Sequence, residues 1–142
     1  MRRLAAQGCL HIAHTVRDAA GTTVALNRYT AAVSGRYQLL DEGRNVAPKR
    51  HEPFFRRHPR TIAGTTWDGK IVLATIDGRS GRSVGATLRE AGAVAWALGL
   101  CDAINLDGGG STTMSIRGKL ANNVSGRRER PVSDALVWRR KR

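Results

Sequence analysis

One stretch of the chain, residues 102–116, gathers the side chains whose types and spacing could do chemistry. An apolar run ends at Asn105 and Asp107, and three glycines and then the hydroxyl residues Ser111 and Thr112 follow. Consecutive glycines carry no Cβ, so their backbone can adopt positive φ angles and form a nest of N–H groups around an anion. This pattern predicts an active site for an anionic substrate, with strands on both sides of the loop. Asp107 is the candidate catalytic carboxylate, and the candidate binding residues are Asn105, Gly108, Gly109, Gly110, Ser111 and Thr112.

The same glycine run has other interpretations. Glycine clusters are common in loops, so residues 108–110 could form a flexible hairpin loop that Asp107 caps. A nucleotide-binding P-loop is excluded, because no lysine follows the glycines and a strand pattern rather than a helix pattern comes next. Ser111 as a classical nucleophile lacks support, since no Gly-x-Ser-x-Gly motif surrounds it. The neighbouring motifs favour an active site over a plain loop.

Seven segments in a fixed order extend the pattern beyond the glycines. They are Arg57-His-Pro-Arg-Thr61 with Gly64, residues 76–79, 83–90, 98–99 and 103–114, Arg117-Gly-Lys119, and Arg130-Pro-Val132. Together they resemble the phosphodiester glycosidase family over about residues 30–138. The family's earlier part, with its Asn-Gly-Phe-type segment, has no counterpart here. We therefore expect a chain that is truncated at its front or internally started.

The resemblance implies hydrolysis of a sugar-1-phosphodiester at its glycosidic C–O bond, which yields a free sugar and a phosphomonoester. Such a reaction needs a carboxylate near C1 and groups that stabilise the departing phosphate. Asp107 is the candidate for the carboxylate, and Asp77 and Glu90 are candidates for a second acid. The glycine amides and the hydroxyl residues could bind the phosphate. Arg60 and Arg79 could do so too, because the planar arginine fork binds two phosphate oxygens at once.

Several of these candidates also have a purely structural interpretation. Glu90 is explained completely by a helix capping box, and Asp77 could simply begin a turn. Arg60 could be a solvated strand residue. His58, a candidate for a catalytic or sugar-binding role, could only pack in its loop. A buried Asn105 at a strand end would need hydrogen-bond partners that a substrate could provide.

Composition and charge limit the classes of function. A chain of 142 residues with 41% hydrophobic content is long enough for one domain with a core. The net charge of +13 suits a nucleic-acid binder, but no basic helix, zinc spacing or aromatic stacking motif accompanies it, so nucleic acid is a disfavoured partner. A phosphorylated glycan, a cell-surface polymer or arginine-rich codon usage explains the charge equally well. A noncatalytic module that binds anionic glycan or nucleic acid, with activity lost by truncation, is the second hypothesis.

Cofactor and location are constrained by a few residues. Cys9 and Cys101 define no disulfide framework, and Cys101 is expected to be a small buried side chain. No histidine has cysteine or carboxylate partners at metal spacing, so we expect no cofactor and no transition metal, while a structural calcium ion stays open. No run is long enough to span a membrane, and the first residues do not form a signal peptide. The resemblance implies an extracellular or cell-surface location; the oligomeric state is unknown.

Periodicity and turn residues predict the secondary structure. Asp68-Gly69 predicts a two-residue turn that joins strands 61–66 and 70–76. A capping box predicts a helix over about residues 88–98 that starts at Thr87, with Gly99 in the left-handed conformation at its end. Further expected elements are a short helix within residues 1–20 and strands at 22–29, 30–40 and 132–138.

These elements predict an α+β fold, with a mostly antiparallel or mixed β-sheet covered by one main helix. We expect residues 30–138 to form the phosphodiester glycosidase-like domain, truncated at its front. Residues 1–29 form a poorly assigned N-terminal segment. The basic tail 139–142 is expected to be disordered.

Overall fold

The structure is a computed structural model that describes residues 15–18, 20–28, 30, 32–126 and 128–138. The chain divides into two compact units, residues 1–32 and 33–142. In the first unit, Arg17 and Thr23 form an isolated antiparallel bridge. The predicted strand 22–29 is wrong for the described residues, because their side chains are exposed and provide no buried face that would fix a longer pairing. Most of the predicted helix 1–20 lies outside the described residues, and residues 15–18 are not helical.

The second unit is built on a five-stranded sheet in the order β2-β1-β5-β3-β4. All of its pairs are antiparallel, which confirms the predicted sheet type. The central strand β5 pairs with β1 on one side and with β3 on the other. The strands are β1 (Gln38–Asp41), β2 (Arg44–Asn45), β3 (Arg60–Thr66), β4 (Ile71–Ile76) and β5 (Leu100–Asn105).

The predicted hairpin of β3 and β4 is confirmed, but its turn is longer than predicted. Thr66 N donates to Lys70 O at 3.0 Å, so the loop contains the three residues 67–69. Among them only Gly69 has a positive φ, of 78°. A three-residue hairpin loop needs one left-handed residue, whereas the predicted two-residue turn would need two.

The helix α1 (Leu88–Ala97) begins as predicted. Thr87 Oγ1 accepts a hydrogen bond from Glu90 N at 3.2 Å, and Thr87 N donates to Glu90 Oε2 at 2.9 Å, which completes the capping box. Gly99 has a φ of 81° and ends the helix in the left-handed conformation, as predicted.

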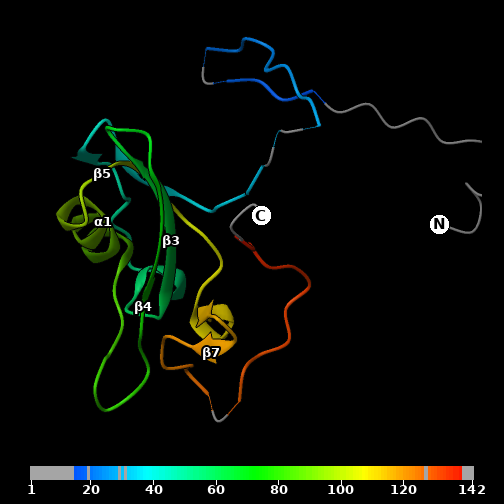
Figure 1. Cartoon of the computed structure of the whole chain (residues 1–142). Helices are drawn as coiled ribbons and strands as arrows, with labels where there is room; N and C mark the ends of the chain where they lie inside the picture. The colour runs from blue at the N-terminus through cyan, green and yellow to red at the C-terminus, as the bar shows by residue number, and fades with distance from the viewer. Residues whose placement is uncertain (1–14, 19, 29, 31, 127, 139–142) are drawn as a thin grey trace, which may run out of the picture. The chain divides into compact units, whose positions relative to one another are not determined.

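One face of the sheet is covered by α1 (Figure 1), and the hydrophobic core lies between them. The helix contributes Leu88 together with the small residues Ala91 and Ala95, all of which are buried. Small side chains let a helix lie close to a sheet. On the sheet side, the core includes Leu40, Ile62, Leu100 and Ala103.

The remaining elements are short. Two 3-10 turns, η2 (Pro53–Phe55) and η3 (Gly109–Ser111), lie in the loops before β3 and after β5. The strands β6 (Ser115–Ile116) and β7 (Lys119–Leu120) form a separate small hairpin. The predicted strand 30–40 is wrong in extent, since pairing begins only at Gln38. The predicted strand 132–138 is also wrong, because these residues are exposed and pair with no described strand. With one helix and an antiparallel sheet, the α+β class is confirmed.

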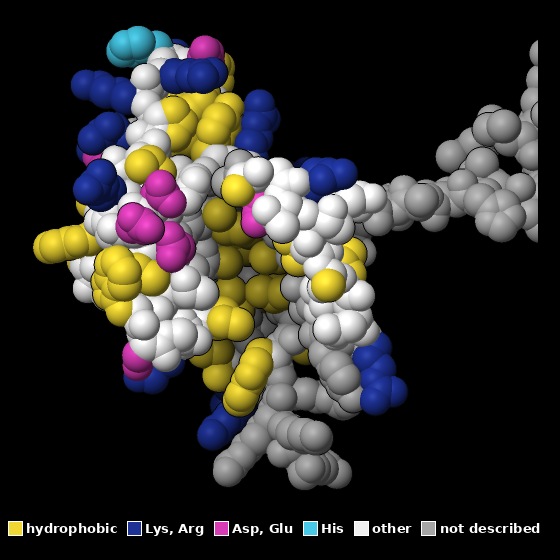
Figure 2. Space-filling view, turned by 90° about the horizontal axis from the view of Figure 1, so that it is seen from above, with side chains coloured by type: hydrophobic (Ala, Val, Ile, Leu, Met, Phe, Trp, Pro, Cys, Tyr) yellow, Lys and Arg dark blue, Asp and Glu magenta, His cyan; other side chains and the backbone are white. Residues whose placement is uncertain are grey.

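Figure 2 shows that lysine and arginine side chains lie in separate groups over the visible face rather than in one continuous patch. Within the described part of the chain, no helix is long and apolar enough to cross a membrane. Cys101 is buried, as predicted. Cys9 and the tail 139–142 lie outside the described residues.

The capping box supports a prediction about acid stability. The hydrogen bonds from Arg57 and from Thr87 N lower the pKa of Glu90 from 4.5 to about 2. Its contribution to the free energy of unfolding is therefore complete above pH 4.5 and is lost as the pH falls towards about 2. Glu90→Gln should destabilise the protein at neutral pH by up to about 1 kcal/mol, since the group is partly exposed.

Urea unfolding at several pH values tests this prediction. The difference between wild type and Glu90→Gln should shrink as the pH falls from 4.5 to 2. The exposed Glu129→Gln is the matched control. A difference that stays constant over this range would contradict the assigned role of the carboxylate.

Candidate functional site

The end of the central strand β5 positions the site. Ile62 of β3 pairs with Asn105, the last residue of β5, and Leu106 N donates to Thr61 O at 2.9 Å. On the other side, Asn105 N donates to Tyr37 O at 3.0 Å. Because neighbouring strands hold this end of β5 on both sides, the residues that follow it start from a fixed point.

The glycine loop folds back onto the beginning of β3. Gly109 N donates to Pro59 O at 2.9 Å, and a Cβ at Gly108 would lie only 2.8 Å from the same oxygen. A glycine is therefore required at position 108 for this close approach. Gly108 N donates to Asp107 Oδ1 at 2.9 Å. The expected nest of free amides is thus not formed, because two of the three glycine N–H groups already have partners within the protein.

Arg79 lies directly against this loop. A Cβ at Gly109, whose φ is 62°, would come within 3.1 Å of Arg79 Nη2, so the bare backbone makes room for the guanidinium group. Arg79 itself has a φ of 57°. A left-handed backbone is strained for an arginine, and such strain tends to occur at functional sites. The exposed Arg79 thus combines a strained backbone with a guanidinium held over the loop.

His58 orients this guanidinium. Its Nδ1 lies 3.1 Å from Arg79 Nη2, and its Nε2 lies 2.8 Å from Pro53 O. The carbonyl oxygen can only accept and the guanidinium can only donate, so these two contacts assign Nε2 of His58 as the donor and Nδ1 as the acceptor. The structure therefore brings together three predicted site residues: His58, Arg79 and Gly109.

Arg130 was not among the predicted site residues. A Cβ at Gly110 would lie 3.1 Å from Arg130 Cδ and 3.7 Å from its Nη1, so this side chain lies along the loop as well. The sequence feature that could have identified Arg130 was the Arg130-Pro-Val132 segment, which is one of the seven segments of the family resemblance. The residue types in this segment do not by themselves indicate a catalytic or binding role. Ser125 Oγ also contacts the loop, donating to Gly109 O at 3.2 Å.

Arg60 has a different environment from Arg79. It is 2% exposed. Its Nε donates to Ala86 O at 2.9 Å, and its Nη2 donates to the carbonyl oxygens of Phe54 and Arg56 at 2.8 and 2.9 Å. Burial and the nearby charge of Arg79 lower the pKa of Arg60. Arg60 is therefore not the solvated strand residue considered above, and it ties the loop before β3 to the segment before α1.

The other two candidate carboxylates have partners elsewhere. Asp77 accepts hydrogen bonds from Asn123 N at 3.1 Å and from Asn123 Nδ2 at 2.7 Å, and it lines a second cavity with Ser80–Ser83 and Asn123. Glu90 binds Arg57 and the start of α1. A strongly lowered pKa suits Glu90 poorly for proton donation.

The hydroxyl residues after the glycines differ from each other. Thr112 is 1% exposed, and its Oγ1 accepts from Thr61 Oγ1 at 3.3 Å, so it helps to pack the loop. Ser111 is half-buried at the end of η3.

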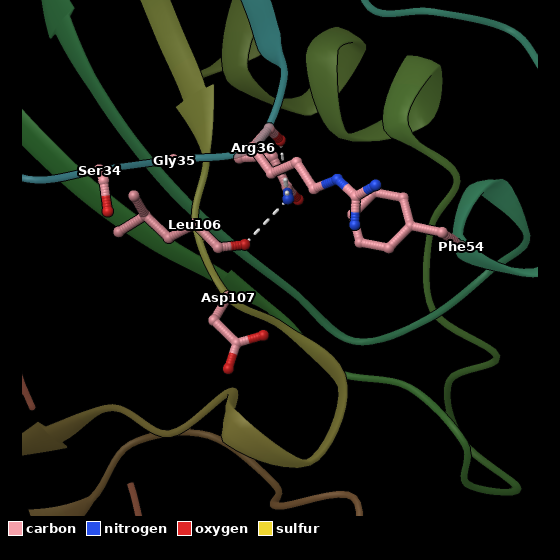
Figure 3. A pocket seen from close by; sticks show the side chains of 7 residues that line it. Ser34, Gly35, Arg36, Phe54, Leu106 and Asp107 are labelled. Carbon is pink, nitrogen blue, oxygen red and sulfur yellow. Dashed lines mark hydrogen bonds between the residues drawn. The ribbon is translucent and has the colours of Figure 1, made fainter. Parts of the chain in front are cut away.

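A cavity of about 360 Å³ opens beside Asp107. Figure 3 shows the carboxylate of Asp107 below the segment that carries Ser34, Gly35 and Arg36, with the Arg36 side chain extended towards Phe54. Asn105 and Leu106 also line this cavity. Asn105 is 2% exposed, and its Oδ1 has no hydrogen-bond partner among the described residues. An unmet buried acceptor costs about 1–3 kcal/mol.

No group of three or more histidine, cysteine, aspartate or glutamate side chains able to hold a metal ion occurs among the residues that the structure describes. The site thus consists of one exposed carboxylate beside a cavity and a guanidinium over an adjacent glycine loop.

Comparison with known proteins identifies the family. The model of the phosphodiester glycosidase family matches residues 3–139. The chain belongs to this family, which confirms the resemblance found in the sequence motifs. The match includes residues before 30, where the motifs alone gave no correspondence.

Individual relatives are much longer than this chain. An uncharacterised prophage-derived protein of Bacillus subtilis, YomE, is 42% identical over 81 residues, which are 57% of this chain and 13% of that protein. The catalytic domain of zebrafish N-acetylglucosamine-1-phosphodiester alpha-N-acetylglucosaminidase, auto-inhibited by its pro-peptide, is 28% identical with a TM-score of 0.56. The match covers 76% of this chain and 38% of that one. A hypothetical protein from Synechocystis is 29% identical with a TM-score of 0.52, over 62% and 17% of the two chains.

The environment of Arg60 generates a prediction about stability. Arg60→Met keeps an apolar stem but leaves three carbonyl oxygens without their charged donor. We expect the free energy of unfolding to fall by about 2–4 kcal/mol, measured by urea unfolding. The exposed Arg56→Met should change it by less than about 0.5 kcal/mol. Equal effects of the two substitutions would contradict the role of Arg60.

Proposed function

We propose that this domain hydrolyses a sugar-1-phosphodiester at the glycosidic C–O bond. The observation that carries the proposal is the joint placement of Asp107 beside a cavity and of the Arg79 guanidinium against Gly109. Gly109 follows Asp107 by two residues in the sequence. Two residues span at most about 7 Å. The sugar and phosphate parts of one substrate can therefore reach both groups at once. Membership of the phosphodiester glycosidase family supports the same reaction.

In this proposal Asp107 acts at the sugar C1. The C1–O bond breaks with its electron pair leaving on the phosphate oxygen. Water supplies the new hydroxyl of the free sugar and releases its remaining proton to the solvent. The transition state carries positive charge at C1, which an adjacent carboxylate stabilises. Asp107 is exposed and is held by Gly108 N, so it stays oriented and accessible.

Arg79 binds the departing phosphomonoester, with Arg130 beside it. A phosphomonoester anion leaves readily when donors neutralise its growing charge. His58 is a positioning residue, because its Nδ1 holds one nitrogen of Arg79 and leaves the other guanidinium N–H groups to face a phosphate. The glycine backbone mainly provides space for the phosphate and supplies few hydrogen-bond donors to it.

The second hypothesis, a noncatalytic module for anionic glycan, has two observations in its favour. Among the described residues, Asp107 is the single carboxylate lining its cavity, whereas glycosidases usually employ two. The chain also spans only 38% of the zebrafish catalytic domain. An extracellular or cell-surface location is likewise a proposal, made from the family.

The enzymatic hypothesis predicts loss of sugar release on a single substitution. Asp107→Asn should lower the rate of free-sugar release from a panel of sugar-1-phosphodiesters by at least about 100-fold. Substrate binding should persist, because the neutral amide keeps the size of the side chain.

The matched control is Asp134→Asn, at an exposed residue outside the named helices and strands. It should release sugar at the wild-type rate. If folded wild type binds the diesters but releases no sugar, the domain is a binding module and the enzymatic proposal fails. If Asp107→Asn releases sugar at the wild-type rate, the role assigned to Asp107 is wrong.

A further inference from the structure

The buried amide of Asn105 carries an inference beyond the general reaction. Its Nδ2 donates to Leu106 O at 2.8 Å and to Arg36 O at 3.4 Å, while Oδ1 has no partner among the described residues. Exchanging the two amide atoms would place an oxygen against two carbonyl oxygens. The orientation is therefore fixed by the surrounding backbone, and the unmet group is an acceptor.

A buried unmet acceptor calls for an explanation. Asn105 is held rigidly, because its backbone is paired in β5 and its O accepts from Arg36 N at 2.8 Å. The side chain cannot relieve the unmet acceptor by turning away without losing both Nδ2 bonds. A hydrogen-bond donor from outside the protein is the remaining solution.

The cavity beside Asn105 provides the space for such a donor. Its volume of about 360 Å³ lies within the range of small-molecule sites. Asn105 and Asp107 both line it, and each supplies acceptor oxygens. Acceptors of this kind match the hydroxyl groups of a sugar rather than a phosphate, which carries acceptors of its own.

We propose that this cavity is the sugar subsite and that Asn105 Oδ1 selects the sugar, by accepting a hydrogen bond from one ring hydroxyl or from an acetamido N–H group. The inference rests on the proposed function, since it places the sugar on the Asp107 side and the phosphate on the Arg79 side of the glycine loop. Asn105 is then a specificity-determining residue for the sugar.

Arg36 contributes an exposed side chain to the lining of the same cavity. Oδ1 is covered in the structure, so a ligand atom reaches it only when a neighbouring group moves. The guanidinium of Arg36 lies 4.9 Å from the Phe54 ring centroid and 5.4 Å from that of Tyr37, and Figure 3 shows it reaching across to Phe54. Ring contacts of an exposed guanidinium are weak, so a bound ligand can displace this side chain.

Binding of a ligand series tests the proposal. The ligands are glucose 1-phosphate, N-acetylglucosamine 1-phosphate, analogues that each lack one hydroxyl group, and inorganic phosphate. Calorimetric titration of the wild-type chain should show that removal of one particular donor weakens binding by about tenfold or more, because the acceptor is left unmet. In Asn105→Ala, the parent sugar phosphate and the analogue that lacks this donor should bind with equal affinity.

Two controls separate this inference from the proposed function. Ser115→Ala, at an exposed serine of β6 outside this cavity, should keep the discrimination between the two ligands. Inorganic phosphate should bind wild type and Asn105→Ala equally, since it needs only the arginine side. Failure of inorganic phosphate and of every sugar phosphate to bind would overturn the phosphate site and with it the proposed function.

Other outcomes concern the sugar subsite alone. If the sugar phosphates bind but all analogues bind like their parent, Oδ1 meets no ligand donor and the inference is wrong. This outcome is decided on wild type, so it stands even where Asn105→Ala fails to fold. If Asn105→Ala folds and still discriminates between the ligands, another residue selects the sugar.

Discussion

The contact on which the site depends is the hydrogen bond from Gly109 N to Pro59 O, 2.9 Å long. It joins the loop after β5 to the residue that precedes β3. The contact is possible because Gly108 has no Cβ, which would lie 2.8 Å from the same carbonyl oxygen. This bond places the glycine loop beside the His-Pro-Arg segment. His58, Arg60 and Asp107 thereby come from distant parts of the sequence into one region.

The neighbouring segments hold the two sides of this contact in place. Arg60 donates to three carbonyl oxygens and so fixes the loop before β3 against the segment before α1. On the other side, β5 is paired with both β1 and β3, so its end cannot shift without breaking two ladders. The roles that we propose for Asp107 and Arg79 need such a rigid support, because small displacements weaken both orientation and charge stabilisation.

The sequence predicted the elements whose signals are local. The β3–β4 hairpin, the capping box at Thr87 and the left-handed Gly99 follow from neighbouring residues alone. It failed where pairing or accessibility depends on distant segments. Residues 132–138 have a strand-like alternation, but they pair with no strand in the part of the chain that the structure describes. The Gly109 amide looked free because its acceptor, Pro59 O, lies far away in the sequence. Arg130 was missed for the same reason, since only the fold brings it to Gly110.

The most direct test of the anion site is a titration with inorganic phosphate, followed by nuclear magnetic resonance of backbone amides and arginine side chains. Our account predicts that the Nε–H signals of Arg79 and Arg130 and the amide of Gly110 shift together with one affinity, because these groups surround the same loop. Shifts confined to the arginines of residues 56–57 and 128, with Arg79 and Gly110 unchanged, would contradict it. The net charge of +13 would then bind anions without a defined site.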